Sequence, residues 1–253
     1  MKRQLFKVIL GVAIMSTAAC AQAQTANRTD TAPIIDGDPD DAAWANPAWR
    51  EMKYLMLGSQ PEPADFNGRY TLTWTEEHLY LLAEITDDIL IDSHPDPLDF
   101  YWADDALEIF VDEDGSGGLH QFDYNAFAYH VALDNQSVDI GPYESEEKRL
   151  AGDAAFMTYP EHVKAVWKRS GEAPYKLYWE VQMTLHDANG NAVRLSAGKK
   201  LGFMVAYCDA DSPAGREHFM GDVEIEPVDG SRDLGYIDAS VFGELTLTDK
   251  NKR

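Results

Sequence analysis

Hydrophobic and polar residues alternate with a period of two along much of this chain, a pattern typical of β-strands with one buried face. The clearest example is 106–112, where Leu107, Ile109 and Val111 share one face and two carboxylates share the other with Phe110. The pattern predicts further strands at 69–75, 79–86, 121–134, 163–168, 176–185, 201–208 and 242–248. No long segment with the 3.6-residue period of a helix follows residue 23. We therefore expect an all-β fold, an antiparallel β-sandwich, in a single domain over residues 33–249.

The first 23 residues have the organisation of a secretory signal peptide. Lys2 and Arg3 precede an apolar run over 8–14, which is too short for a membrane span. We therefore expect an exported protein, periplasmic or extracellular. The residues that follow, 24–32, are polar and predict a flexible leader.

Two cleavage sites fit the end of this segment. Ala21 and Ala23 match an ordinary signal-peptidase site. Residues 17–20 instead resemble a bacterial lipobox, in which case Cys20 would carry lipid and anchor the protein to a membrane as an outer-membrane lipoprotein. Because Cys20 is removed or lipidated in either case, Cys208 has no partner for an intramolecular disulfide. We expect Cys208 to be an inert core thiol.

The charge of the chain restricts its partners. The signal holds three cations and no acid, so its removal takes the formal charge from −23 to −26. So acidic a protein should bind neither nucleic acid nor an anionic membrane surface. Solubility accounts for most of this charge, and abundant carboxylates also make cation sites easy to build. We expect a monomer.

The turn after the strand at 106–112 is a candidate calcium site. Asp112, Asp114 and Ser116 alternate like oxygen ligands, and neighbouring glycines allow a tight turn. The turn lacks the bidentate Glu at the twelfth position of an EF-hand, where Asp123 stands instead. The alternative interpretation is a solvated acidic turn.

The same stretch contains candidates for carbohydrate binding. A sugar ring presents C–H groups to an aromatic face and hydroxyls around its edge, so a site needs flat apolar side chains beside polar ones. Trp102 follows two aromatic residues, and Glu108, Asp123 and Asn125 would share a polar sheet face if their strands pair in a suitable register. The alternative is that these polar residues form only the solvated face of the sheet.

In its ordered motifs the chain resembles a carbohydrate-binding module of family 9. The motifs, in chain order, are IIDGDPDDAAW, HLYLLAEITDD, WADDALEIFVDEDGSGG, YWEVQMTL, LGFMVAYCDAD and FGELTL. The resemblance covers nearly all of the mature chain. It implies a jelly-roll type of antiparallel β-sandwich with bound calcium, in which sugar-binding members clamp a sugar between two aromatic rings.

The resemblance also implies roles for individual residues. Trp102 matches one clamping aromatic, and Tyr236 matches the second, which is usually Trp. Glu108 matches a carboxylate that accepts hydrogen bonds from sugar hydroxyls, and Asn125 matches a polar contact. Asp123 departs from the pattern, because the best-studied sugar-binding type has Arg there. An acceptor in place of a guanidinium changes which hydroxyls can be satisfied.

Two other functions remain as alternatives. A glycoside-active enzyme needs two carboxylates on either side of one bond, and no retaining-hydrolase signature is present. A b-type haem-binding sandwich domain would need axial ligands, for which Met220 and His130 are candidates; a C-x-x-C-H motif is absent. We therefore favour a non-catalytic carbohydrate-binding protein.

Overall fold

A computed structural model describes residues 24–152 and 155–249, so the predicted signal peptide and Cys20 lie outside the described residues. No helix in the described ranges is long and apolar enough to cross a membrane. The strands are β1 Gln24–Arg28, β2 Arg50–Met52, β3 Tyr54–Gly58, β4 Phe66–Trp74, β5 Leu79–Asp87, β6 Ala106–Asp112, β7 Phe127–Ala132, β8 Ser137–Ile140, β9 Phe156–Thr158, β10 Val163–Ser170, β11 Tyr175–Met183, β12 Lys200–Asp209, β13 His218–Gly221 and β14 Gly243–Thr248. The helices are η1 Ala42–Trp44, α1 Glu146–Ala151 and η2 Ala239–Val241.

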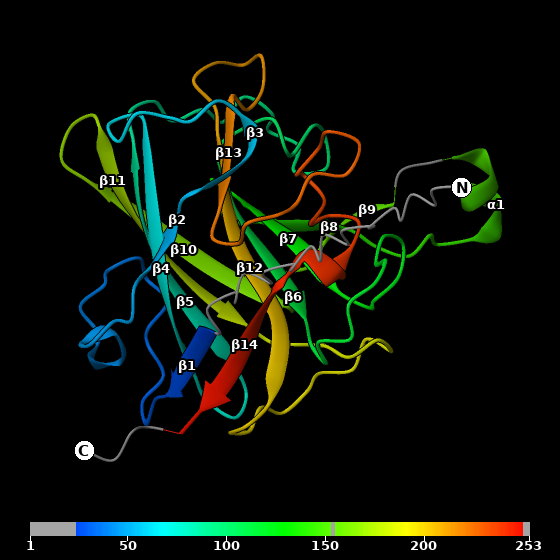
Figure 1. Ribbon diagram of the computed structural model, residues 1–253, viewed down its shortest axis with the longest axis horizontal. Coiled ribbons are helices and arrows are strands. Elements are labelled where there is room, and N and C mark those ends of the chain that lie inside the picture. The colour runs from blue at the N-terminus through cyan, green and yellow to red at the C-terminus, as the bar shows by residue number, and fades with distance from the viewer. Residues whose placement is uncertain (1–23, 153–154, 250–253) are drawn as a thin grey trace, which may run out of the picture.

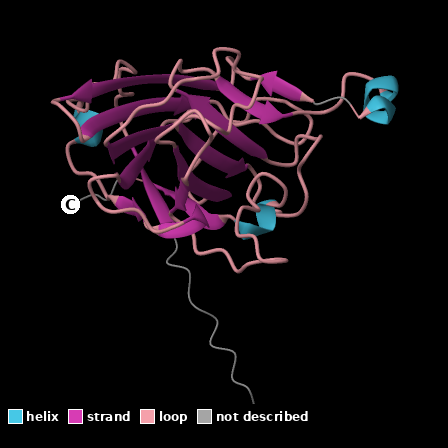
Figure 2. Cartoon of the chain, turned by 90° about the horizontal axis from the view of Figure 1, so that it is seen from above, coloured by secondary structure: helices cyan, strands magenta, loops and turns pink. Residues whose placement is uncertain are grey.

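The strands form two packed layers (Figures 1 and 2). Hydrogen bonds connect them in the order β10-β11-β5-β4-β1-β14-β12-β6-β7-β8-β9, with β2 added to β4, β13 added to β12, and β3 added to β13. Strand β1 runs parallel to β4 and β14, and the other strand pairs are antiparallel. The prediction of an antiparallel β-sandwich is therefore confirmed.

The main core lies between the layers and is built by the alternation seen in the sequence. Leu107, Ile109 and Val111 of β6 point into it and are at most 2% exposed. They meet Trp179 of β11 and Tyr70 of β4, which come from the opposite layer. The outward face of β6 and β12 carries a second, smaller apolar cluster. This outward face is covered rather than solvated, and it holds the candidate site described below.

The prediction of a flexible leader is wrong for residues 24–28. They form β1, which pairs with β14 along its length and with β4 at its end. Ala26 is fully buried, and the Gln24 amide donates a hydrogen bond to Asp222 at 2.7 Å. A polar five-residue strand has too little alternating hydrophobicity to be distinguished from a leader, because its stability comes from partners distant in sequence.

The strand predicted over 121–134 is wrong in its first half. β7 begins only at Phe127, and 121–126 form a loop in which Phe122 has a φ of 65°. The Asp123 carboxylate accepts a hydrogen bond from the Asn125 backbone N–H at 2.9 Å. Such side-chain to backbone bonds stabilise a turn at the expense of a ladder, which is why the alternation of polar and aromatic residues here does not produce a strand.

Candidate functional site

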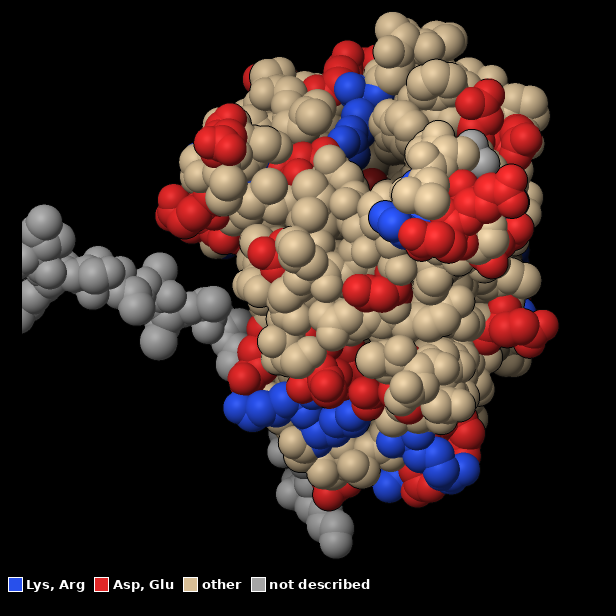
Figure 3. Space-filling model, turned by 90° about the vertical axis from the view of Figure 1, so that its right-hand side faces the viewer, with Lys and Arg blue, Asp and Glu red and all other residues tan. Residues whose placement is uncertain are grey.

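The outward face of β6, β7 and β12 contains a cavity of about 300 Å³. Ala128 of β7, a small side chain, is one of the residues that line it. Figure 3 views the molecule from this side, where the surface is hollowed and acidic side chains are more widely spread than basic ones. The cavity is lined by Tyr101, Trp102, Glu108, Ala128, His130, Ile140, Phe156, Arg216, Asp233 and Tyr236.

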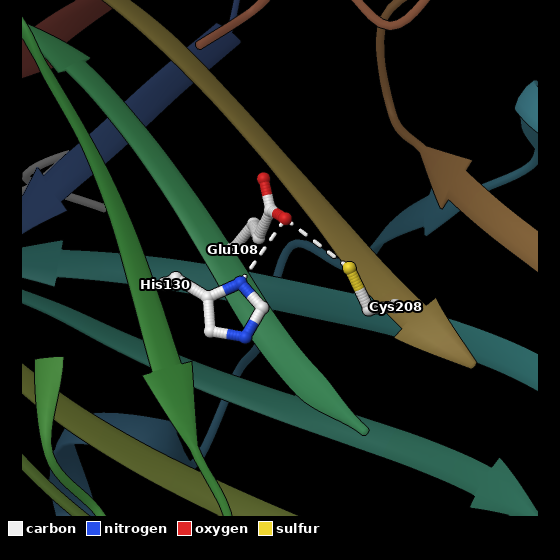
Figure 4. A group of neighbouring side chains, drawn as sticks. All are labelled: Glu108, His130 and Cys208. Atoms are coloured by element: carbon white, nitrogen blue, oxygen red, sulfur yellow. Dashed lines mark hydrogen bonds and ion pairs between the residues drawn. The ribbon is translucent and has the colours of Figure 1, made fainter. Parts of the chain in front are cut away.

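Glu108 is the centre of the polar floor of this cavity. It is 7% exposed, and one of its oxygens lies 3.2 Å from Nδ1 of His130 and 3.1 Å from the Cys208 thiol, which donates to it (Figure 4). His130 is the cross-strand neighbour of Glu108 on β7. Burial would raise the pKa of Glu108, but the hydrogen bond from His130 and the charges around it lower the pKa below its usual value. Glu108 is therefore a buried, ionised acceptor.

Arg216 supplies the cation that pairs with Glu108. It precedes β13, is largely buried, and its Nη1 lies 3.6 Å from Glu108 and 3.4 Å from the Cys208 sulfur. Its other amino group donates to Asp233, and its guanidinium lies over the Phe219 ring at 4.5 Å. Burial raises the pKa of the Asp233 carboxyl, and the Arg216 charge lowers it. Burial has the larger effect, so the pKa is raised overall. One guanidinium thus holds two carboxylates in fixed positions.

Aromatic rings form the walls of the cavity. Trp102 is 36% exposed, and its ring contacts Tyr101 at 5.1 Å and Phe156 at 6.0 Å between centroids. Tyr236 comes from a separate loop and is 39% exposed. The preceding Gly235 fixes that loop close to the sheet, since a side chain at this position would meet Phe110 at 2.7 Å. Two half-exposed aromatics from different loops therefore border one cavity with a polar floor.

Three of the five predicted sugar-binding residues meet in this cavity, namely Trp102, Glu108 and Tyr236. Asp123 and Asn125 do not line it. The Asn125 amide donates to the Gly117 carbonyl at 2.9 Å, so these two residues connect neighbouring loops. Their predicted place in the site assumed in part that a strand begins at residue 121, whereas β7 begins at Phe127. The β7 residue directly opposite Glu108 is His130.

The sequence interpretation missed Arg216 and Asp233. The signal for Arg216 was present, because residues 209–244 contain many carboxylates and only two cations, Arg216 and Arg232. A rare guanidinium in an acidic segment is a candidate for a buried ion pair. Its partner Glu108 is far away in sequence, so the pairing itself required the fold.

The two candidate haem ligands lie on opposite faces of one layer. Met220 is part of the core between the layers, together with the β7 side chains Tyr129 and Val131. His130 alternates with those two residues and points to the outward cavity. The two side chains therefore cannot bind one iron from opposite sides, so Met220 and His130 cannot be the axial ligands of one haem.

Comparison with known proteins agrees with this geometry. A profile of the family described as "Carbohydrate family 9 binding domain-like" matches residues 35–250. The chain belongs to this family.

The curated relatives of this family 9 chain are much longer proteins. It is 35% identical over 110 residues to an endo-1,4-beta-xylanase A of Thermotoga neapolitana, which corresponds to 43% of the chain and 10% of that enzyme. It is 25% identical over 229 residues to an endo-1,4-beta-xylanase A of Thermoanaerobacterium saccharolyticum, or 90% of the chain and 16% of that enzyme. The chain thus spans only a small part of either relative.

Solved structures share the fold. A family 9 carbohydrate-binding module of Caldicellulosiruptor kristjanssonii, in complex with glucose, is similar with a TM-score of 0.63 at 19% identity. The similarity covers 92% of this chain and 98% of that module. The same organism's module has also been solved in complex with cellotriose.

At the turn predicted to bind calcium, the carboxylates accept hydrogen bonds from the backbone, as those of Asp87 and Asp105 also do. Both Asp112 oxygens accept backbone N–H groups, from Gly115 at 3.0 Å and Gly117 at 2.7 Å. Asp114 accepts the Ser116 N–H at 3.0 Å. These carboxylates already cap the turn, and the glycines have the positive φ that such a turn needs.

A different set of carboxylates fits a hard cation better. Asp87, Asp105 and Asp209 are buried at neighbouring strand ends, and one oxygen from each lies within 4.8 Å of the others. Asp209 is 1% exposed, and neither of its oxygens has a hydrogen-bond partner among the described residues. Burial raises the pKa of all three carboxyls, and adjacent carboxylates add to this. Calcium prefers several carboxylate oxygens, so this cluster has the donor set the ion requires.

Proposed function

We propose that this family 9 chain is an exported, non-catalytic carbohydrate-binding protein that holds one sugar or glycan end between Trp102 and Tyr236. The observation that supports this function is the single cavity of about 300 Å³, bordered by both aromatics and floored by Glu108. Such a volume lies at the lower end of small-molecule sites. A short piece of glycan is therefore the ligand that matches the size of the cavity.

Each part of the cavity has a distinct role in the proposed complex. The rings of Trp102 and Tyr236 offer apolar faces to the C–H groups of a sugar. Glu108 accepts hydrogen bonds from hydroxyls, and the Arg216 guanidinium donates them. Because Arg216 and Asp233 hold each other, these polar groups are already ordered before the sugar arrives. The cavity thus contains a guanidinium, that of Arg216 in the loop between β12 and β13, although position 123 is Asp.

The arrangement supports binding over hydrolysis. Glycosidases use one carboxyl group as a protonated acid and another as base or nucleophile on either side of the scissile bond. The cavity carboxylates Glu108 and Asp233 are instead both paired with Arg216. Neither is free to act in the way such a mechanism requires.

We further propose that calcium is held by Asp87, Asp105 and Asp209 rather than by Asp112, Asp114 and Ser116. The unpartnered oxygens of Asp209 support this assignment. When bound, the ion would neutralise carboxylates that the fold buries together at the ends of β5 and β12 and before β6. Its role would be structural, because its ligands would come from three segments distant in sequence, the ends of β5 and β12 and the residue before β6.

Two assays test the binding function. Calorimetric titration of the mature protein with glucose and cellotriose is expected to show saturable binding. Incubation with xylan and cellulose is expected to release no reducing sugar, whereas steady release would favour the enzyme alternative. Failure to bind either sugar would contradict the proposed binding function.

A further inference from the structure

Phe100 is a large apolar side chain in an unusual place. It is 55% exposed, and its backbone has a φ of 48°. Bulky residues are disfavoured in this left-handed region, which glycine adopts without strain. Neither burial nor backbone preference explains a phenylalanine here. An unfavourable conformation that the fold maintains is a reason to look for a function of the side chain.

The Phe100 ring extends the aromatic wall of the cavity outward. Its centroid lies 5.6 Å from that of Trp102, which lines the cavity, and 5.7 Å from that of His94. Phe100 itself is not among the lining residues. The three rings therefore form a continuous aromatic strip that begins in the cavity and ends on the open surface.

The segment that carries Phe100 is held in place on both sides. The Ala103 N–H donates to the Phe100 carbonyl at 2.8 Å. The Asp104 carboxylate accepts the N–H groups of Ser93 and His94, at 2.8 and 2.7 Å, and so closes the loop on itself. A ring on such a loop is ordered before any ligand binds, which lowers the entropy cost of stacking.

We propose that Phe100 is a second stacking platform, outside the cavity, for the next sugar units of the same glycan. This inference rests on the proposed function, because Trp102 must hold the first unit. A flat, exposed ring adjoining a sugar site suits the C–H face of a pyranose. Asp96 and Asp99 lie in the same loop, and their charges disfavour a uronate-containing chain. The occupant is therefore a neutral oligosaccharide of two or more units.

The proposal predicts a dependence on ligand length. Titrations with glucose, cellotriose and cellotetraose would compare wild type with Phe100→Gly, Phe100→Tyr and Leu98→Ala. Phe100→Gly is expected to weaken binding of both longer ligands by roughly three- to tenfold, the scale of one stacking contact, and to leave glucose affinity unchanged. Phe100→Tyr keeps the ring and should bind like wild type. Leu98→Ala removes an exposed apolar side chain of the same loop, 38% exposed, and should change nothing.

The outcomes separate this inference from the proposed function. An equal loss for glucose and cellotriose in Phe100→Gly would mean that Phe100 acts only through Trp102, and would overturn the platform. No loss for either longer ligand would overturn it as well. If wild type binds none of the three sugars, the proposed function fails, and the platform fails with it. Thermal melts serve as a folding control, since Phe100→Gly relieves the positive φ and should not lower the melting temperature.

Discussion

At the scale of single residues, the site depends on one buried ionic group of three side chains. Glu108 and Asp233 are both paired with Arg216 beneath the aromatic walls, and Cys208 donates to the same Glu108 oxygen as His130. The sequence leaves a solvated sheet face as the alternative interpretation for Glu108, and at a solvated position a substitution would cost little stability. Its 7% exposure changes that expectation, because each lost hydrogen bond now leaves a buried partner.

Glu108→Gln is therefore expected to reduce both affinity and stability. Removing the charge leaves Arg216 with only Asp233, and bonds to charged groups contribute about 2 kcal/mol each. Denaturant unfolding and sugar titration would measure the two effects. Glu244→Gln is a matched control, since Glu244 pairs with Lys200 at the surface, where such pairs are worth about 0–1 kcal/mol. Equal stability of the two variants would show that Glu108 is not part of a buried ionic group.

At the scale of elements, the two-residue period predicted most strands and failed where side chains bond to their own backbone. The β4–β5 hairpin, β10–β11 and β12 lie close to their predicted ranges, since each has apolar residues on a regular face. The start of β7 was misplaced because 121–125 alternates polar and aromatic residues while forming a turn. This error supported the placement of Asp123 and Asn125 in the site, which the family resemblance also implied, and it left His130 out of the predicted sugar-binding residues. The scarcity of cations around Arg216 marks it as a candidate for an ion pair, but its partner Glu108 is distant in sequence, so its place in the site could not be predicted.

The proposed calcium site at Asp87, Asp105 and Asp209 leads to a prediction about metal binding. If calcium binds the folded cluster as proposed, adding it should raise the melting temperature of wild type and of Asp114→Asn, but not of Asp209→Asn. Differential scanning calorimetry after chelation, with and without calcium, tests this. If calcium failed to raise the melting temperature of Asp114→Asn but still raised that of Asp209→Asn, the calcium site would lie in the turn after β6.

The same cluster predicts how metal-free protein responds to pH. The pKa values of Asp87, Asp105 and Asp209 rise from 3.8 to about 7, 9 and 8, mainly through burial. Between the ordinary pKa of an Asp carboxyl and these raised values, the folded state binds more protons than the unfolded state. The free energy of unfolding therefore falls as pH rises from about 4 to 8. Chelated protein should therefore unfold at lower denaturant concentration at pH 8 than at pH 5, and calcium should reduce that difference. A calcium-free protein that is more stable at pH 8 would contradict the cluster's assignment.

At the scale of the whole molecule, the N-terminal strand connects the two layers. β1 lies between β4 and β14, and Gln24 at its start bonds to the buried Asp222. A cut after Ala23 leaves this strand complete, and a lipidated Cys20 would precede it by a short tether. We therefore expect exported protein from a bacterial host to begin near Gln24 or at a lipid-modified Cys20. Intact-mass spectrometry distinguishes the two, and an exported chain that retains Met1 would contradict both.

The most direct test of the central claim is calorimetric titration of wild type and Trp102→Ala with glucose and cellotriose, alongside thermal melts. Trp102 is 36% exposed at the border of the cavity, so its loss should weaken sugar binding several-fold, on the order of 1 kcal/mol, with a small change in melting temperature. A buried core tryptophan would instead cost about 3–5 kcal/mol of stability on truncation. A large fall in melting temperature with unchanged sugar affinity would contradict the claim that Trp102 and Tyr236 hold the sugar.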